Sequence, residues 1–155
     1  MNSRKERPQR PTILLTVIGF AMLASGPFVM DPASTPRDQW SWHGTVHQLL
    51  GAIGFTLMPV SCFVFWRRFR KDTLWRTFAG WTLAAGVIIV AAIVLMKIGQ
   101  IEPVATNSIS PWIGLLQRVA LITYFAWIVA FAWRLGLLHE ANVTPTAPGF
   151  PPSLE

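Results

Sequence analysis

The sequence predicts an all-α, polytopic membrane protein: a bundle of four transmembrane helices with both termini in the cytoplasm. Three observations predict this fold class. The 155 residues are 52% hydrophobic and only 13% charged, whereas soluble domains carry about 25% charged residues. The charges gather in short runs that are separated by long apolar segments. Lys and Arg are concentrated at one set of segment ends, which is the pattern of the positive-inside rule.

Four segments are long and apolar enough to cross a bilayer, whose core of roughly 30 Å requires about 20 helical residues. Backbone groups in lipid must be paired within one segment, so we expect helices. The first segment has an alternative interpretation as a signal peptide, because basic residues precede it and small residues follow. The spans are expected near residues 12–30, 44–66, 77–99 and 112–136, which together form a transmembrane domain over 12–136.

Basic residues in the connections predict the orientation. The N-terminal arm, residues 1–11, holds four of them, and the connection between the second and third spans holds five. The connection between the first two spans holds only Arg37, and the one between the last two holds none. The arm, the middle connection and the proline-rich tail, residues 137–155, are therefore expected in the cytoplasm. We expect that tail to be disordered and the protein to lie in a bacterial inner (cytoplasmic) membrane.

The net charge of +6 does not indicate a nucleic-acid partner. The basic residues flank apolar segments, and no nucleic-acid-binding motif accompanies them. The single cysteine, Cys62, lies within an apolar run and excludes an internal disulfide.

Ionisable and amide side chains gather where the predicted spans meet the outer leaflet. Such groups are costly in a membrane and usually face the bundle interior, where they pair with one another. Arg118 keeps its proton, so it requires an acceptor, for which Asp31 is the first candidate and Glu102 the second. The predicted polar cluster consists of Asp31, His43, His47, Lys97, Gln117 and Arg118.

Two histidines, His43 and His47, stand four residues apart at the start of the second span. That spacing places them on one face of a helix. Paired helical histidines of this kind can bind zinc, with Asp31 as a third ligand and one position left for water. The alternative is a purely structural role, in which the two rings donate hydrogen bonds to loop carbonyls.

Several short motifs occur in a fixed order. Asp31-Pro32 closes the first span, His-Gly-x-x-His at 43–47 opens the second, and RRFRK follows that span. GLLQR, at 114–118, then leads into a last apolar span that ends in WRLG. In this arrangement the chain resembles the bacterial integral-membrane family catalogued as domain of unknown function 998.

The resemblance implies a polytopic membrane protein and marks Asp31, His43, His47 and Arg118 as motif positions. It also implies that this chain lacks the family's first two spans. The chain is then a short variant, a truncated reading frame or a protein that needs a partner. The family has no assigned activity.

The function favoured by these features is a non-catalytic bundle with a polar cluster near the outer leaflet. One alternative is a transporter or proton-coupled carrier subunit that uses Asp31, His47 and Arg118 as a relay. The other is a metal-dependent hydrolase acting on a lipid-like substrate, whose anionic headgroup Arg118 and Lys97 would hold. The expected partners are the lipid bilayer and either a second copy or another membrane subunit.

Overall fold

Helices make up the regular structure of the chain. The computed structural model describes residues 10–32, 35–101 and 109–143. Within these ranges no strand occurs, so the all-α prediction is confirmed. The elements are α1 (Arg10–Ser25), a 3₁₀ turn η1 (Arg37–Gln39), α2 (Trp42–Phe69), α3 (Arg76–Ile101), a second 3₁₀ turn η2 (Ser110–Trp112) and α4 (Ile113–Val143).

Three of the helices, α2, α3 and α4, are long and apolar enough to cross a membrane. Their apolar side chains are often exposed: Trp81 is 75% and Trp133 is 72% accessible. An apolar surface of this extent fits a lipid environment rather than water. The three helices therefore indicate a membrane protein.

The first predicted span is shorter than expected. The sequence predicts apolar helix over residues 12–30, but α1 ends at Ser25. Gly26 and Pro27 follow directly. The residue before a proline is disfavoured in the α conformation, and proline has no N–H to continue the ladder. α1 is thus an apolar helix below the length of the other three.

The last helix is longer than expected. The sequence predicts a span over 112–136 and a disordered tail from residue 137, but α4 continues to Val143. No proline interrupts the chain between Trp112 and Thr144, and Pro145 is the next helix breaker. Residues 137–143 are therefore helical, and the remainder of the predicted tail lies outside the described residues.

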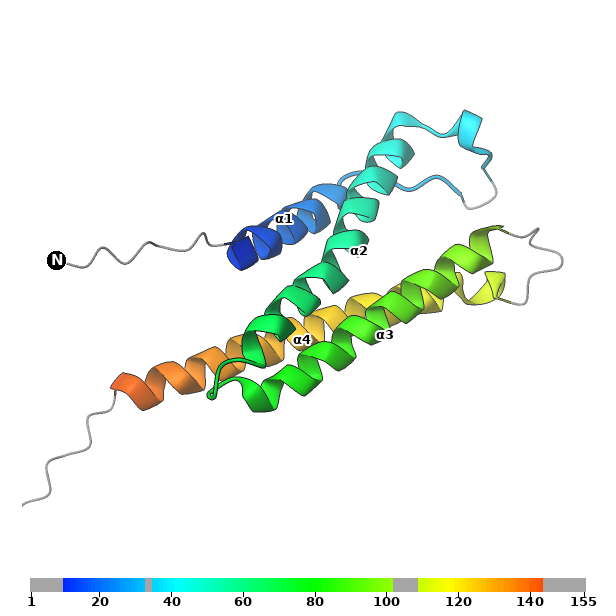
Figure 1. Cartoon of the computed structure of the whole chain (residues 1–155). Helices are drawn as coiled ribbons and strands as arrows, with labels where there is room; N and C mark the ends of the chain where they lie inside the picture. The colour runs from blue at the N-terminus through cyan, green and yellow to red at the C-terminus, as the bar shows by residue number, and fades with distance from the viewer. Residues whose placement is uncertain (1–9, 33–34, 102–108, 144–155) are drawn as a thin grey trace, which may run out of the picture.

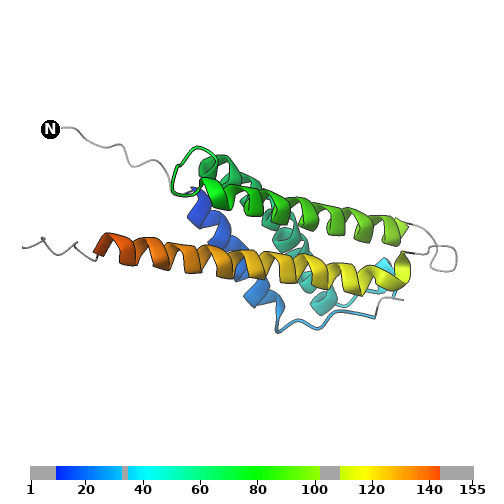
Figure 2. The same cartoon turned by 90° about the horizontal axis from the view of Figure 1, so that it is seen from below.

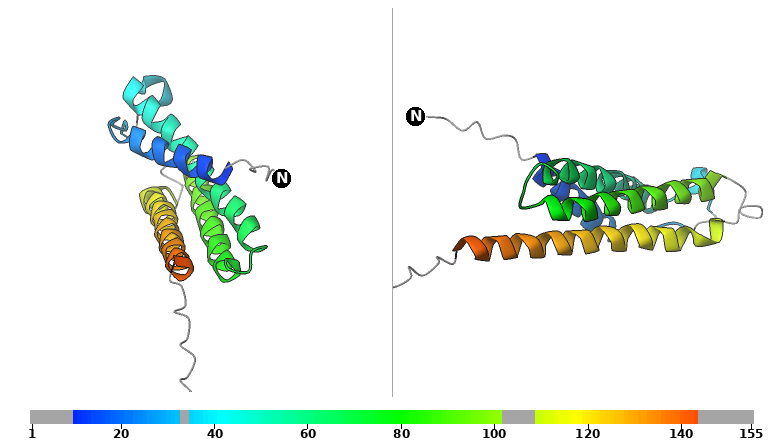
Figure 3. Two further views of the ribbon diagram at one scale, coloured as in Figure 1. Left: turned by 90° about the vertical axis from the view of Figure 1, so that its left-hand side faces the viewer. Right: turned by 60° about the horizontal axis from the view of Figure 1, so that its bottom comes forward.

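The helices pack in chain order, α1 on α2, α2 on α3 and α3 on α4. α3 and α4 run side by side along their length, and α2 crosses them obliquely (Figures 1 and 2). Figure 3 shows α1 lying against α2, away from the α3–α4 pair. Gly54 in α2 lies against the end of the Met22 side chain of α1.

Six aromatic rings form a cluster where α2 passes into α3. Phe69 stacks on Trp75 with ring centroids 4.7 Å apart, and Trp127 stacks on Phe131 at 5.8 Å. Rings in such offset or tilted contacts stabilise one another beyond their burial. We call this set the aromatic cluster: Phe65, Phe69, Trp75, Phe78, Trp127 and Phe131.

Two buried hydroxyls connect the helices beside the aromatic cluster. Thr82 Oγ1 donates to the Phe78 carbonyl at 3.0 Å and accepts from Trp127 Nε1 at 3.1 Å. Ser61 Oγ donates to the Met58 carbonyl at 2.7 Å and lies 3.4 Å from the Tyr124 hydroxyl. α4 is thereby joined to both α3 and α2 through polar groups inside an apolar core.

Candidate functional site

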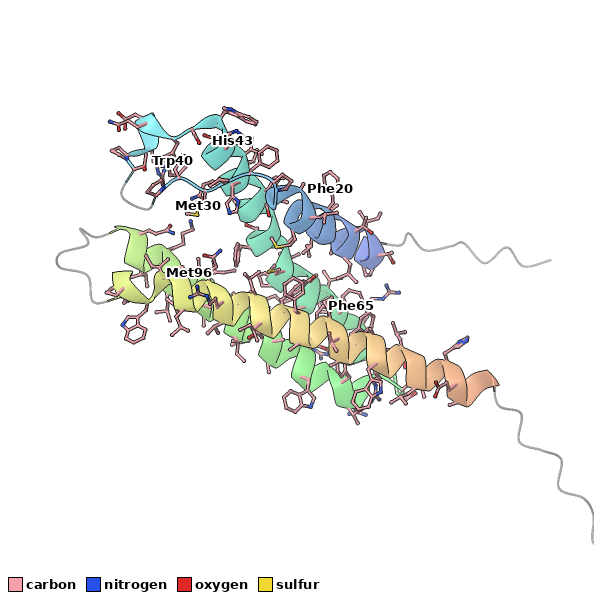
Figure 4. The ribbon with its side chains drawn as sticks, turned by 180° about the vertical axis from the view of Figure 1, so that it is seen from behind. Phe20, Met30, Trp40, His43, Phe65 and Met96 are labelled. Atoms are coloured by element: carbon pink, nitrogen blue, oxygen red, sulfur yellow. The ribbon has the colours of Figure 1, made fainter. Side chains whose placement is uncertain are left out.

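The candidate site lies at the junction end, the end of the bundle where α1 and α3 finish and α2 and α4 begin. Met30, Trp40 and His43 all lie toward this end (Figure 4), whereas Phe65 of α2 packs against Trp127 of α4 away from it. The short 3₁₀ turn η1 lies between the segment after α1 and the start of α2; its N-cap is Pro36, and no side chain caps it.

Asp31 connects the segment after α1 to the first turn of α2. Its Oδ2 accepts a hydrogen bond of 2.9 Å from the backbone N–H of Ser41. Ser41 is the N-cap of α2, and its Oγ accepts from the Gly44 N–H at 3.0 Å. A carboxylate at a helix N-terminus is also favoured by the helix dipole. Asp31 therefore holds the start of α2 both by a directed bond and by its charge.

Gly44 is the residue that lets Asp31 come so close. A Cβ at this buried position would lie 2.6 Å from Asp31 Cγ and would also collide with Oδ2. Real Cβ atoms do not approach that closely. The glycine of the His-Gly-x-x-His motif thus has a steric role at the α1–α2 junction.

His47 joins α2 to the end of α1. Its Nδ1 lies 3.0 Å from the Phe28 carbonyl oxygen and 3.3 Å from that of Ser25. Because carbonyl oxygens only accept hydrogen bonds, Nδ1 carries the proton in this arrangement. The Ser25 carbonyl belongs to the last residue of α1 and also accepts from the Phe28 N–H at 3.2 Å, whereas the Phe28 carbonyl lies in the segment after α1.

His43 has different surroundings from His47. Its exposed ring stacks on Trp42, with centroids 3.6 Å apart, and lies 6.0 Å from the ring of Phe28. The two histidines are therefore engaged separately, one by aromatic rings and the other by carbonyls. Among the described residues there is no group of three or more His, Cys, Asp or Glu side chains that could hold a metal ion.

A polar cavity of about 430 Å³ lies beside these contacts. Of the predicted cluster, Asp31 and Lys97 line it. Lys97 Nζ donates to Gln100 Oε1 at 3.2 Å. Sequence reasoning did not single out Gln48 and Gln100, which also line the cavity with Arg37. The spacing of Lys97 and Gln100, three residues apart on one helix, is the signal that predicts their contact.

Gln117 and Arg118 do not line this cavity. Arg118 is exposed and Gln117 is half-buried on the first turns of α4. The hydrogen bond that the structure gives Asp31 goes to Ser41 rather than to Arg118. Glu102, the second partner expected for Arg118, lies outside the described residues. The structure thus brings Asp31 and Lys97 together and leaves Gln117 and Arg118 apart from them.

The family of the chain follows from comparison with known proteins. A search of the curated proteins gave no match, and neither did a search of the solved structures. The model of the family described as "Protein of unknown function (DUF998)" matches residues 3–134. This match covers most of the chain, including the Asp31-Pro32 and His-Gly-x-x-His motifs and all of α1, α2 and α3. The chain therefore belongs to that family, as the order of its motifs predicts.

Proposed function

We propose that this chain is a non-catalytic membrane protein whose family motif residues fasten α1 to α2 and so hold the junction end together. The observation that carries the proposal is the placement of His47, whose Nδ1 lies within hydrogen-bond distance of the carbonyls of Ser25, the last residue of α1, and Phe28, three residues after it. Asp31 supports the proposal from the segment after α1, because it accepts from the N-cap residue of α2. Both groups therefore connect the end of α1, or the segment that follows it, to the start of α2.

The stability of detergent-purified protein tests this role. His47→Ala and Asp31→Ala should each lower the free energy of unfolding by about 1–2 kcal/mol, because half-buried backbone partners lose a hydrogen bond. Arg118→Gln is the control, since Arg118 is exposed, and should change it by less than about 0.5 kcal/mol. Unchanged stability in His47→Ala would show that the ring is retained for some other purpose.

The proposed orientation places both termini in the cytoplasm, α1 to α4 across the inner membrane and the junction end outside. Its support is the distribution of basic residues, which are dense between α2 and α3 and sparse at the junction end. Single cysteines at Gln39 and Thr73, both exposed, test it after Cys62→Ser. An impermeant thiol reagent applied to intact cells should label Gln39→Cys and leave Thr73→Cys unlabelled. The reverse pattern would invert the orientation.

The second candidate function is a transporter or carrier subunit, favoured by the polar cavity that Asp31, Arg37 and Lys97 line. A carrier needs charged groups at a water-filled site within the membrane. Of the proposed relay, Asp31 lines this cavity, whereas His47 and Arg118 do not. A second copy or another membrane subunit would then complete the path.

The metal-dependent hydrolase stays a prediction with less support. Zinc would require Asp31, His43 and His47 to converge, and their hydrogen bonds and ring contacts lead to different neighbours. Metal analysis of the purified protein decides this point. Zinc bound in wild type and lost in His47→Ala would favour the hydrolase over the non-catalytic bundle.

A further inference from the structure

A second hollow lies on the surface of the α3–α4 pair. It is an apolar groove of about 760 Å³, and its lining residues all belong to α3 and α4. α1 and α2 contribute none of them, so the groove opens on a face that these two helices leave uncovered. Four residues with small side chains line the groove, which makes room for its depth: Ala84, Ala85, Ala126 and Ala130. The exposed rings of Trp81 and Trp133 line it as well.

The groove follows only half of the helices that form it. On α3 its lining runs from Thr77 to Ile88 and on α4 from Leu137 back to Ile122. At 1.5 Å per residue these stretches measure about 16 Å and about 22 Å. One leaflet of a bilayer has a hydrocarbon depth of about 15 Å, half of the whole core. A lipid tail ends at this depth, whereas a transmembrane helix packed on the pair would follow its whole length.

The headgroup end of the groove carries a positive charge. Arg134 lines the groove, and its guanidinium carbon lies 5.7 Å from the centre of the Trp75 ring. Its Nη2 donates to the Leu74 carbonyl and, at 3.0 Å, to Thr77 Oγ1. Within the described part of the chain, the buried Nε has no hydrogen-bond partner. A guanidinium has five N–H donors and matches the geometry of a phosphate.

Further charges surround this end of the bundle. The α2–α3 connection and its flanks hold five basic residues between Arg67 and Arg76, against one acidic residue, Asp72. Glu140 lies farther along α4. Basic residues beside transmembrane helices attract anionic lipids, each by roughly a fivefold change in binding. The charge at this end therefore complements a phosphate rather than a cation.

We propose that the α3–α4 groove binds one anionic phospholipid, with an acyl chain along the four alanines and the phosphate beside Arg134. The cytoplasmic leaflet follows from the proposed orientation, whereas the site itself does not depend on that orientation. If cysteine labelling inverted the topology, the lipid would belong to the other leaflet. If wild type showed no lipid preference, the proposed lipid site would be wrong, and the proposed role of His47 would be unaffected.

Lipid retention by the whole chain tests the headgroup contact. The protein is placed in nanodiscs of equimolar phosphatidylglycerol and phosphatidylcholine, and native mass spectrometry counts the lipids that stay bound after release. Wild type should retain phosphatidylglycerol about fivefold over phosphatidylcholine. Arg134→Gln should lower this preference severalfold, and Arg134→Lys, which keeps the charge, should retain most of it. Equal retention of both lipids by wild type would overturn the proposal, and so would a preference that Arg134→Gln leaves unchanged.

A matched pair of variants tests the acyl-chain contact. Ala126→Phe fills the groove, whereas Ala132→Phe adds the same bulk to an exposed position of α4 that does not line it. Ala126→Phe should reduce the retention of lipid severalfold, and Ala132→Phe should match wild type. Circular dichroism confirms that both variants stay helical. Chemical cross-linking tests whether a second copy occupies the groove instead. If wild type formed a cross-linked dimer that Ala126→Phe prevented, and lipid retention did not change, the occupant would be a second copy and the lipid proposal would fail.

Discussion

The two ends of the bundle are stabilised by different kinds of contact. At the α2–α3 turn, the aromatic cluster brings six rings from α2, α3, α4 and the turn itself into contact. At the junction end, single hydrogen bonds from Asp31 and His47 to backbone atoms connect the elements, and a cavity of about 430 Å³ lies beside them. One end is therefore held by many non-directional contacts and the other by a few directional ones.

This difference predicts how each end responds to substitution. In the aromatic cluster many packing contacts each contribute to the free energy of unfolding, so removing one large ring lowers it in proportion to the volume lost. A directional contact depends on geometry, so a single added methyl group can displace it.

The largest effect is expected for Trp127→Ala. Trp127 is buried, contacts Phe65, Tyr124 and Phe131, and donates to Thr82. Removing a buried tryptophan should lower the free energy of unfolding by about 3–5 kcal/mol, as measured by denaturation in mixed detergent micelles. Trp127→Phe keeps much of the ring and loses the bond to Thr82, so its loss should be nearer 1 kcal/mol. Equal losses in both variants would show that the hydrogen bond, not the packing, stabilises this end.

An intermediate effect is expected for Gly44→Ala. The added Cβ would collide with the Asp31 carboxylate, so the free energy of unfolding should fall by about 1–3 kcal/mol. Gly51→Ala is the matched control on the same helix, because a Cβ there meets nothing within 4 Å.

A double-mutant cycle sharpens this prediction. In an Asp31→Ala background the collision with the carboxylate is gone and only the Asp31 backbone nitrogen stays close, at 3.3 Å, so Gly44→Ala should then cost less than it does with Asp31 present. If the cost stayed the same with and without the carboxylate, the close approach of Asp31 would not be the reason for the glycine.

The smallest effect is expected for Lys97→Met. Lys97 is exposed, and its Nζ donates a hydrogen bond to Gln100 on the same helix. Exposed pairs of this kind contribute little, so unfolding should change by less than about 0.5 kcal/mol. Denaturation under the same conditions measures it. A loss comparable to that of Trp127→Ala would mean that the junction end depends on the charges of its cavity after all.

Much of the fold could be predicted from local pattern. The helical class and the positions of α2 and α3 follow from apolar runs and their basic flanks. Two boundaries differed: Pro27 ends α1 earlier, at Ser25, and the absence of proline carries α4 on to Val143. Both errors arose because apolar character was used to place helix ends that backbone chemistry decides.

The candidate site could be predicted only in its location. The sequence indicates that polar residues gather at one end, and Asp31 and Lys97 do line one cavity there. It leaves open whether the histidine rings meet a metal or backbone carbonyls, and it does not indicate which carbonyls His47 faces or that His43 stacks on Trp42. Helical spacing places two side chains on one face, but χ angles and neighbouring elements decide where each ring points.

The sequence by itself determined the helical class, the apolar character of each segment and the family, because these depend on runs of neighbouring residues. Only the tertiary structure decided which partner each polar side chain meets, and it formed the groove between α3 and α4. The physical reason is that transfer into lipid is a property of one segment at a time. Hydrogen bonds and grooves instead depend on the relative placement of residues far apart in the chain, such as Thr77 and Arg134.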